Sequence, residues 1–176
     1  MQQIVRLLLL ACPLWAAALP AWSAMPESEV RAAIIVNFIH YVEWPDASAG
    51  NSDVRICVVG QGNTADALMA FNGKSIHGLR VTVENRSHYP SSAANCRVLF
   101  IGESSSRAPI DWLREVAGQP VLTVSEGDDF LPNGGIISLN RIGSRITFDV
   151  NLVAMRRSSL RIGSQLLRLA RDVHGK

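Results

Sequence analysis

The pattern of apolar positions first becomes regular after Ser28. Four apolar residues follow one another at steps of four, four and three, which is typical of one face of an α-helix. They are Val30, Ile34, Phe38 and Tyr41. Proline disfavours helical backbone at the residue before it, so the Trp44-Pro45 pair ends the pattern. The spacing predicts a helix that ends near Trp44.

Four short apolar runs follow, and helical segments separate most of them. The runs are rich in β-branched residues, which is typical of buried strands, and the segments between them carry apolar residues at helical spacing. The predicted strands are residues 54–60, 79–84, 98–101 and 121–124, and the predicted helices are residues 63–71 and 109–116.

The pattern changes after the last of these strands. Residues 126–135 are rich in Gly, Asp, Asn and Pro, which is typical of loops. Residues 136–139 and 146–150 then predict a β-hairpin. A helical stretch follows from Leu152, and apolar residues at 160, 162, 166, 167 and 169 predict one C-terminal helix.

This order of elements predicts an α/β fold. Alternating strands and helices favour a mostly parallel central sheet, and the hairpin favours an antiparallel edge. We therefore expect residues 24–176 to form a single-domain α/β sandwich with flavodoxin-like strand order, in which Cys57 on the first strand and Cys96 before the third would meet.

The N-terminus predicts an export signal. Arg6 is followed by an almost wholly apolar stretch, Leu7 to Leu19, which is too short to span a bilayer. Small residues permit cleavage after Ser23, so residues 1–23 are the predicted signal peptide. An uncleaved anchor and lipidation at Cys12 are the alternatives; no stop-transfer charges support the first, and the second would leave a very short apolar core.

Two cysteines remain after the signal is removed. In an exported domain an even pair is expected to form a disulfide, so we expect Cys57 to bond with Cys96. A redox or metal role is the alternative, but the chain has no C-x-x-C motif and no histidine close to either cysteine in sequence.

The net charge excludes some classes of partner. The whole chain has 17 basic and 15 acidic residues, and removal of Arg6 leaves a net charge of about +1. This balance suggests binding neither to nucleic acid nor to an anionic membrane. Since no other apolar run approaches a transmembrane length, we expect no insertion into a membrane after signal cleavage. All but two of the basic residues are arginines, which suits contacts with carboxylates or phosphates, although a coding bias explains it equally well.

Known catalytic and cofactor motifs are missing. Gly60-Gln61-Gly62 lacks the third glycine of a dinucleotide fingerprint and is better explained as a strand-to-helix turn. The acidic loop 126–129 lacks the spacing of a calcium loop, and the four histidines are scattered, so we expect no metal and no cofactor. A hydrolase would need Ser104 or Ser125 beside a base that the sequence does not indicate. We therefore expect a protein that is not an enzyme.

Three sets of residues are candidates for binding a partner or ligand. Phe38, Tyr41 and Trp44 lie together near a helix end, either as interaction anchors or as core packing. A basic cluster, Arg156, Arg157 and Arg161, either binds an acidic surface or is a solvated helix face. Near the hairpin, Arg145 or Arg141 could bind an anionic small ligand.

Six blocks of sequence, in order from Val30 to Ala170, resemble the YfiR family of periplasmic regulators. They are Asn37-Phe38 with Tyr41-Val42-Glu43-Trp44-Pro45, then Ile56-Cys57-Val58-Val59-Gly60, Val98-Leu99-Phe100-Ile101-Gly102, Pro120-Val121-Leu122-Thr123-Val124-Ser125, Gly134-Gly135-Ile136-Ile137 and Ser164-Gln165-Leu166-Leu167-Arg168-Leu169-Ala170.

The resemblance implies a Gram-negative periplasmic protein that binds the periplasmic sensing domain of an inner-membrane diguanylate cyclase. Binding would repress the cyclase, lower cyclic-di-GMP and disfavour biofilm. It also implies a homodimer, and it matches Cys57 and Cys96 to the family's structural disulfide, whereas the second cysteine pair of some members is absent here. A sensor histidine kinase is the alternative partner, and a periplasmic small-ligand binding protein is the alternative function.

Overall fold

The computed structural model describes residues 25–45, 53–87, 92–93, 95–105 and 107–175. The predicted signal peptide, residues 1–23, lies outside them. The elements are α1 (Glu27–Tyr41), β1 (Val42–Glu43), β2 (Asp53–Val59), α2 (Asn63–Met69), β3 (Ser75–Ile76), β4 (Leu79–Asn85), β5 (Val98–Ile101), α3 (Pro109–Glu115), β6 (Leu122–Ser125), β7 (Ile137–Ile142), β8 (Arg145–Asn151), α4 (Leu152–Arg157), β9 (Arg161–Ile162), α5 (Ser164–Leu169) and β10 (Asp172–His174).

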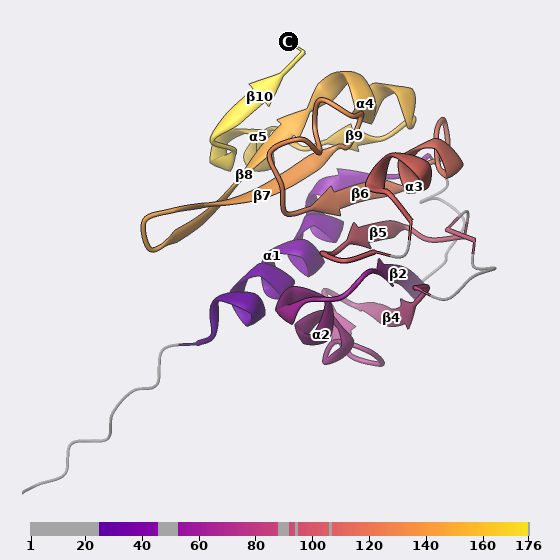
Figure 1. Ribbon diagram of the computed structural model, residues 1–176, viewed down its shortest axis with the longest axis vertical. Coiled ribbons are helices and arrows are strands. Elements are labelled where there is room, and N and C mark those ends of the chain that lie inside the picture. The colour runs from indigo at the N-terminus through magenta and orange to yellow at the C-terminus, as the bar shows by residue number, and fades with distance from the viewer. Residues whose placement is uncertain (1–24, 46–52, 88–91, 94, 106, 176) are drawn as a thin grey trace, which may run out of the picture.

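The main sheet has eight strands in the order β10-β8-β7-β6-β5-β2-β4-β3. From β4 through β2, β5 and β6 to β7 all neighbours are parallel, and this is the flavodoxin-like order that the sequence predicted (Figure 1). The predicted hairpin, β7–β8, is antiparallel and lies one strand in from the edge, because β10 pairs with β8. At the other edge, β3 pairs antiparallel with β4.

Side chains of the central strands alternate between two apolar cores, one on each face of the sheet. Ile56 and Val58 of β2 belong to the core that α1 and α2 cover. Cys57 and Val59 point the other way, into the core that contains Trp112 of α3. Because both faces are covered, β5 is apolar at every position and β2 is apolar from Ile56 to Val59, which is why the sequence shows continuous runs there and not alternation.

Helix α1 forms where the sequence predicts it, but its buried face is different. The buried residues are Ala32, Ile35, Val36, Phe38 and Ile39. Of the predicted stripe only Phe38 is buried, and the other three members are half-buried. The reason is that α1 contacts α2, α5 and β8 together, so that a wider face than one stripe is covered.

The prediction of one C-terminal helix through residues 160–169 is wrong. Ser159 has a left-handed backbone (φ +55°), which ends α4, and Leu160 is buried in the core as part of a loop. The next two residues form β9, which pairs antiparallel with β1, so that Ile162 lies opposite Val42. Only Ser164–Leu169 is helical, because pairing with β1 replaces helical hydrogen bonds in the segment before it.

The last strand, β10, was not predicted from the sequence. Its position depends on Arg171, whose backbone N–H donates to the Phe148 carbonyl at 2.8 Å. The guanidinium of Arg171 also pairs with the buried carboxylate of Asp149, with 2.8 Å between Nε and Oδ1. These contacts hold the chain beside β8, and β10 then covers part of the β8 edge.

The predicted disulfide between Cys57 and Cys96 is confirmed. Cys57 lies in β2 and Cys96 just before β5, and since these strands are neighbours the two Cα atoms are 5.8 Å apart. Both side chains are buried in the core under α3.

We predict that Cys57→Ser lowers the free energy of unfolding by about 4 kcal/mol, because the bond closes a long loop in the unfolded chain. The melting temperature should fall by roughly 10 °C. Thermal melts with and without reductant check this, since reductant should shift the wild type and leave the variant unchanged. Equal melting of the wild type in both conditions would contradict it.

The loop that carries Cys96 is fixed by Glu115 at the end of α3. The Glu115 carboxylate accepts the Ala93 N–H at 2.8 Å and pairs with the Arg107 guanidinium at 2.7 Å. Arg107 also lies 4.2 Å from the centre of the Trp112 ring. Burial acts to raise the pKa of Glu115, but the donors from Ala93 and Arg107 outweigh it, so that this pKa lies below its ordinary value.

A lowered pKa makes stability depend on pH in a defined direction. The folded state favours the ionised Glu115. The contribution of Glu115 to the free energy of unfolding is therefore fully present above its unfolded pKa of about 4.3. It is lost as the pH falls through the lower, folded pKa. We expect Glu115→Gln to be less stable than wild type at pH 7, with the difference shrinking toward pH 3 in urea unfolding. A difference that grows as the pH falls would contradict this.

Candidate functional site

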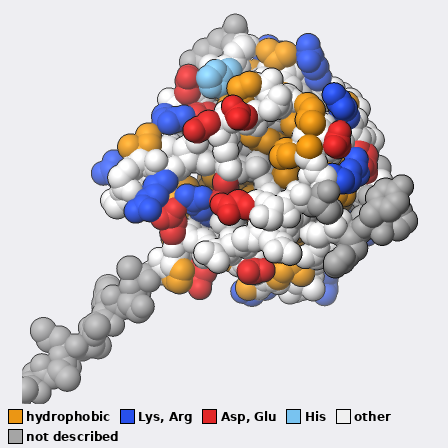
Figure 2. Space-filling model, viewed as in Figure 1, with side chains coloured by type: hydrophobic (Ala, Val, Ile, Leu, Met, Phe, Trp, Pro, Cys, Tyr) orange, Lys and Arg blue, Asp and Glu red, His pale blue; other side chains and the backbone are white. Residues whose placement is uncertain are grey.

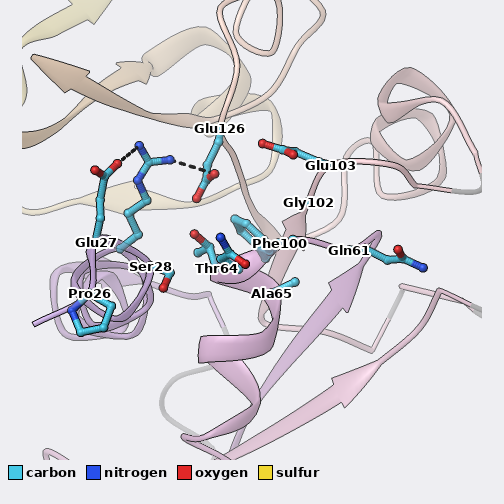
Figure 3. A pocket seen from close by; sticks show the side chains of 13 residues that line it. Pro26, Glu27, Ser28, Gln61, Thr64, Ala65, Phe100, Gly102, Glu103 and Glu126 are labelled. Atoms are coloured by element: carbon cyan, nitrogen blue, oxygen red, sulfur yellow. Dashed lines mark hydrogen bonds and ion pairs between the residues drawn. The ribbon is translucent and has the colours of Figure 1, made fainter.

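A cavity of about 520 Å³ lies at the carboxyl ends of β2 and β5. From here the chain continues to opposite faces of the sheet, with α2 packing in one core and α3 in the other. In open α/β sheets such a switch point is where ligands bind. The walls come from the starts of α1 and α2 and from the loops after β5 and β6 (Figure 3).

Two glycines bring the loops after β2 and β5 into backbone contact beside this cavity. A Cβ on Gly60 would lie 2.7 Å from the Glu103 carbonyl oxygen, and a Cβ on Gly102 would lie 2.7 Å from that of Gln61. The Gln61 N–H donates to the Glu103 carbonyl at 2.7 Å. Gly60 and Gly102 therefore serve the close packing of these two loops.

One wall of the cavity is an ion-pair chain centred on Arg31. Its Nη2 lies 2.5 Å from Glu27 Oε1, and its Nη1 lies 2.8 Å from Glu126 Oε2 (Figure 3). The side chains of Arg31 and Glu126 are largely buried, so this chain joins the first turns of α1 to the loop after β6. Glu126, in the acidic loop where a calcium site was considered, thus pairs with an arginine.

A second hollow, here called the α3–α4 groove, has a volume of about 320 Å³. Its lining combines polar side chains, among them Asn133, Asn151 and Ser158, with these apolar ones: Ile110, Leu113, Val116, Leu131, Ile136, Val153 and Ala154. Arg114 and Arg157 are the charged residues among its lining, and no acidic residue lines it. Figure 2 shows hydrophobic side chains open to view over the region of α3 and α4, with Lys or Arg side chains beside them.

The structure separates the members of the predicted basic cluster. Arg157 lines the α3–α4 groove. Arg156, from the same helix, donates to the Gly175 carbonyl at 2.7 Å. Arg161 lies in β9 opposite Glu43, where its exposed side chain is away from the groove lining.

The two hairpin arginines are both exposed. Arg141 Nε donates to the Gly143 carbonyl at 2.8 Å and lies 3.4 Å from Glu27 Oε2. Arg145 begins β8. An acidic neighbour beside Arg141 disfavours the anionic ligand that the sequence suggested for this position.

The aromatic stretch is mostly core. Phe38 is 2% exposed and packs edge-on against Phe148, with ring centres 5.1 Å apart. Trp44 is 9% exposed, and the Arg97 guanidinium lies 5.7 Å from its ring. Tyr41 is half-buried. In this conformation Phe38 and Trp44 stabilise the domain, and Tyr41 alone offers surface for a partner.

The serines considered for hydrolysis do not form a catalytic group. The buried Ser125 hydroxyl donates to the Ile101 carbonyl at 2.6 Å. Ser104 is exposed in a loop with a left-handed backbone (φ +50°), and no described histidine hydrogen-bonds to it. Within the described ranges, no three His, Cys, Asp or Glu side chains are grouped as a metal site.

Sequence reasoning missed the cavity, although one signal was present. Gln61 and Glu103 each follow a predicted strand closely, and a flavodoxin-like order brings these two strand ends together. The other lining residues could not be predicted in this way. Arg31, Thr64 and Glu126 come from separate elements and belong to no sequence motif.

The structure is that of a single-domain α/β protein with flavodoxin-like strand order, in which a buried disulfide joins β2 to the segment just before β5. A family model described as YfiR/HmsC-like matches residues 28–171, and the chain belongs to this family. Membership supports the general role of a periplasmic regulator. Along the described parts of the chain, no helix has the length and apolar character that crossing a membrane requires.

One solved structure shows the same fold at low sequence identity. It is the crystal structure of a conserved domain protein from Vibrio cholerae O1 biovar El Tor strain N16961, with a TM-score of 0.55 and 14% identity. The match covers 86% of this chain and 61% of that one, so this chain spans less than two thirds of the other's length.

We predict that Gly102→Ala destabilises the protein by about 1–3 kcal/mol, because the added Cβ meets the backbone at Gln61. Gly127→Ala is the matched control, since a Cβ there has no heavy atom within 4 Å. The control should be neutral or slightly stabilising. Urea unfolding of both variants checks this, and equal stability of the two would contradict it.

Proposed function

We propose that this protein is a periplasmic regulator that binds and represses the periplasmic sensing domain of an inner-membrane diguanylate cyclase, and so lowers cyclic-di-GMP. The observation that carries the proposal is membership in the YfiR/HmsC-like family over residues 28–171. The cavity at the strand ends and the α3–α4 groove give such a regulator surfaces on which to bind.

The α3–α4 groove is the surface that best fits a protein partner. Val153 is 38% exposed beside buried apolar residues, and Arg114 and Arg157 lie with it in the lining. An apolar centre with arginine at its border is typical of protein interfaces. Since the groove lining carries only positive charge, the complementary segment of the sensing domain is apolar with acidic residues beside it.

Repression follows if the protein binds one conformation of the sensing domain more tightly than the other. Binding then shifts the sensor's population toward the inactive state, by no more than the difference in the two affinities. A sensor histidine kinase would be bound by the same mechanism. A homodimer stays a prediction from the family resemblance.

We expect Arg157→Glu to weaken capture of the sensor protein about tenfold, because the reversed charge repels an acidic segment. The measurement is quantitative recovery of membrane proteins on the exported, tagged protein. Arg168→Glu is the matched control, as Arg168 is exposed on α5 and outside the groove lining.

Each outcome of this capture experiment has a distinct meaning. Loss with Arg157→Glu and retention with Arg168→Glu supports the groove. Equal recovery by the two variants rejects the groove but keeps the function. A recovered histidine kinase replaces the cyclase as partner, and recovery of no membrane sensor by wild type rejects the proposed function.

A further inference from the structure

We infer that the cavity at the carboxyl ends of β2 and β5 binds a small organic cation that carries a primary ammonium group. This inference goes beyond the proposed function and does not depend on it. The cavity's volume, about 520 Å³, is within the range of roughly 300–1,000 Å³ that small-molecule sites occupy. It also lies at the switch point of the sheet, where open α/β folds bind ligands.

The charge of the lining selects a cation. Glu27, Glu103 and Glu126 line the cavity against the single arginine, Arg31, which leaves a net charge of −2 at neutral pH. Both terminal nitrogens of Arg31 already pair with two of these carboxylates, which surround it with negative charge and disfavour an anionic ligand. The third carboxylate, Glu103, makes no hydrogen bond or ion pair with any described residue, and in Figure 3 it points back toward Glu126.

An independent indication of a ligand is Oε1 of Glu126, which is buried and has no hydrogen-bond partner among the described residues. Buried polar atoms in folded proteins are as a rule hydrogen-bonded, so this acceptor calls for a donor. Thr64, which is 5% exposed, also lines the cavity, and its hydroxyl makes no hydrogen bond within the described part of the chain. Figure 3 shows the Thr64 side chain beside Phe100 and below Glu126, so it lies where a ligand in the cavity would meet it.

These groups together match the chemistry of an ammonium ion on a short carbon chain. An ammonium has three N–H donors, and Thr64 and the carboxylates of Glu103 and Glu126 are acceptors on the same cavity. The Phe100 ring supplies an apolar floor for methylene groups. A divalent metal is disfavoured, because the described residues contain no group of three acidic, His or Cys side chains that could hold one.

The test is calorimetric titration of the signal-free protein with 1,4-diaminobutane. Saturable binding is expected, and a rise in melting temperature should accompany it. Butane-1,4-diol and succinate have the same chain length without the ammonium groups and should not bind. Calcium chloride at equal ionic strength should not reproduce the effect. An absent signal, or an equal response to the diol or to calcium, overturns the inference.

Variants assign the binding to this cavity. Glu103→Gln should weaken binding of 1,4-diaminobutane about tenfold, since it removes one charged acceptor. Thr64→Val should weaken it several-fold without lowering the melting temperature of the free protein, because the hydroxyl has no partner to lose. Glu43→Gln removes the same charge from an exposed position on β1 and should bind as wild type. Unchanged affinity in both cavity variants overturns the assignment.

Discussion

The parallel pairing of β2 with β5 is the constraint on which the rest of the structure depends. Its register places Cys57 opposite Leu99, and this brings the sulfur-bearing residue of β2 close to Cys96 before β5. The same pairing sends α2 and α3 to opposite faces of the sheet, so that each face gains an apolar core. At the far end of the two strands it forces Gly60 and Gly102 into backbone contact.

The cavity at the strand ends and the α3–α4 groove follow from this arrangement and suit different ligands. The cavity at the strand ends is acidic and carries a buried carboxylate oxygen of Glu126 that has no hydrogen-bond partner among the described residues, which suits a small cation. The α3–α4 groove combines apolar and polar side chains with positive charge, which suits an acidic protein surface. They share no lining residue, but β6 joins them, because Thr123 in that strand lines the groove and Glu126 just after it lines the cavity.

Much of the fold could be predicted from the sequence, because the central strands are buried on both faces and therefore show as continuous apolar runs. The cysteine pair then supplied a long-range contact that ordered two of the strands. The prediction was wrong at Leu160, since a buried loop residue and a helix residue look alike in an apolar pattern. The pairing of β9 with β1 determines the conformation of this segment, and it joins residues more than a hundred positions apart in the sequence.

The functional surfaces were less predictable because they also depend on contacts between residues that are far apart in the sequence. Arg157 was identified as a candidate, but the sequence could not separate it from Arg156, which reaches the C-terminal segment. Phe38 and Trp44 looked like interaction anchors because aromatic residues occur in both interfaces and cores. The packing of Phe38 against Phe148 and of Trp44 against Arg97 shows that both belong to the core. Arg31 and Thr64 had no local signal, since their roles arise from α1, α2 and β6 meeting in space.

The central claim is that the protein restrains a diguanylate cyclase from the periplasm. The most direct measurement is the intracellular level of cyclic-di-GMP after deletion of the gene and after complementation with the exported protein. The account predicts a rise on deletion that complementation with the exported form reverses. An unchanged level in the deletion strain, under conditions where the cyclase is present in the membrane, would contradict it.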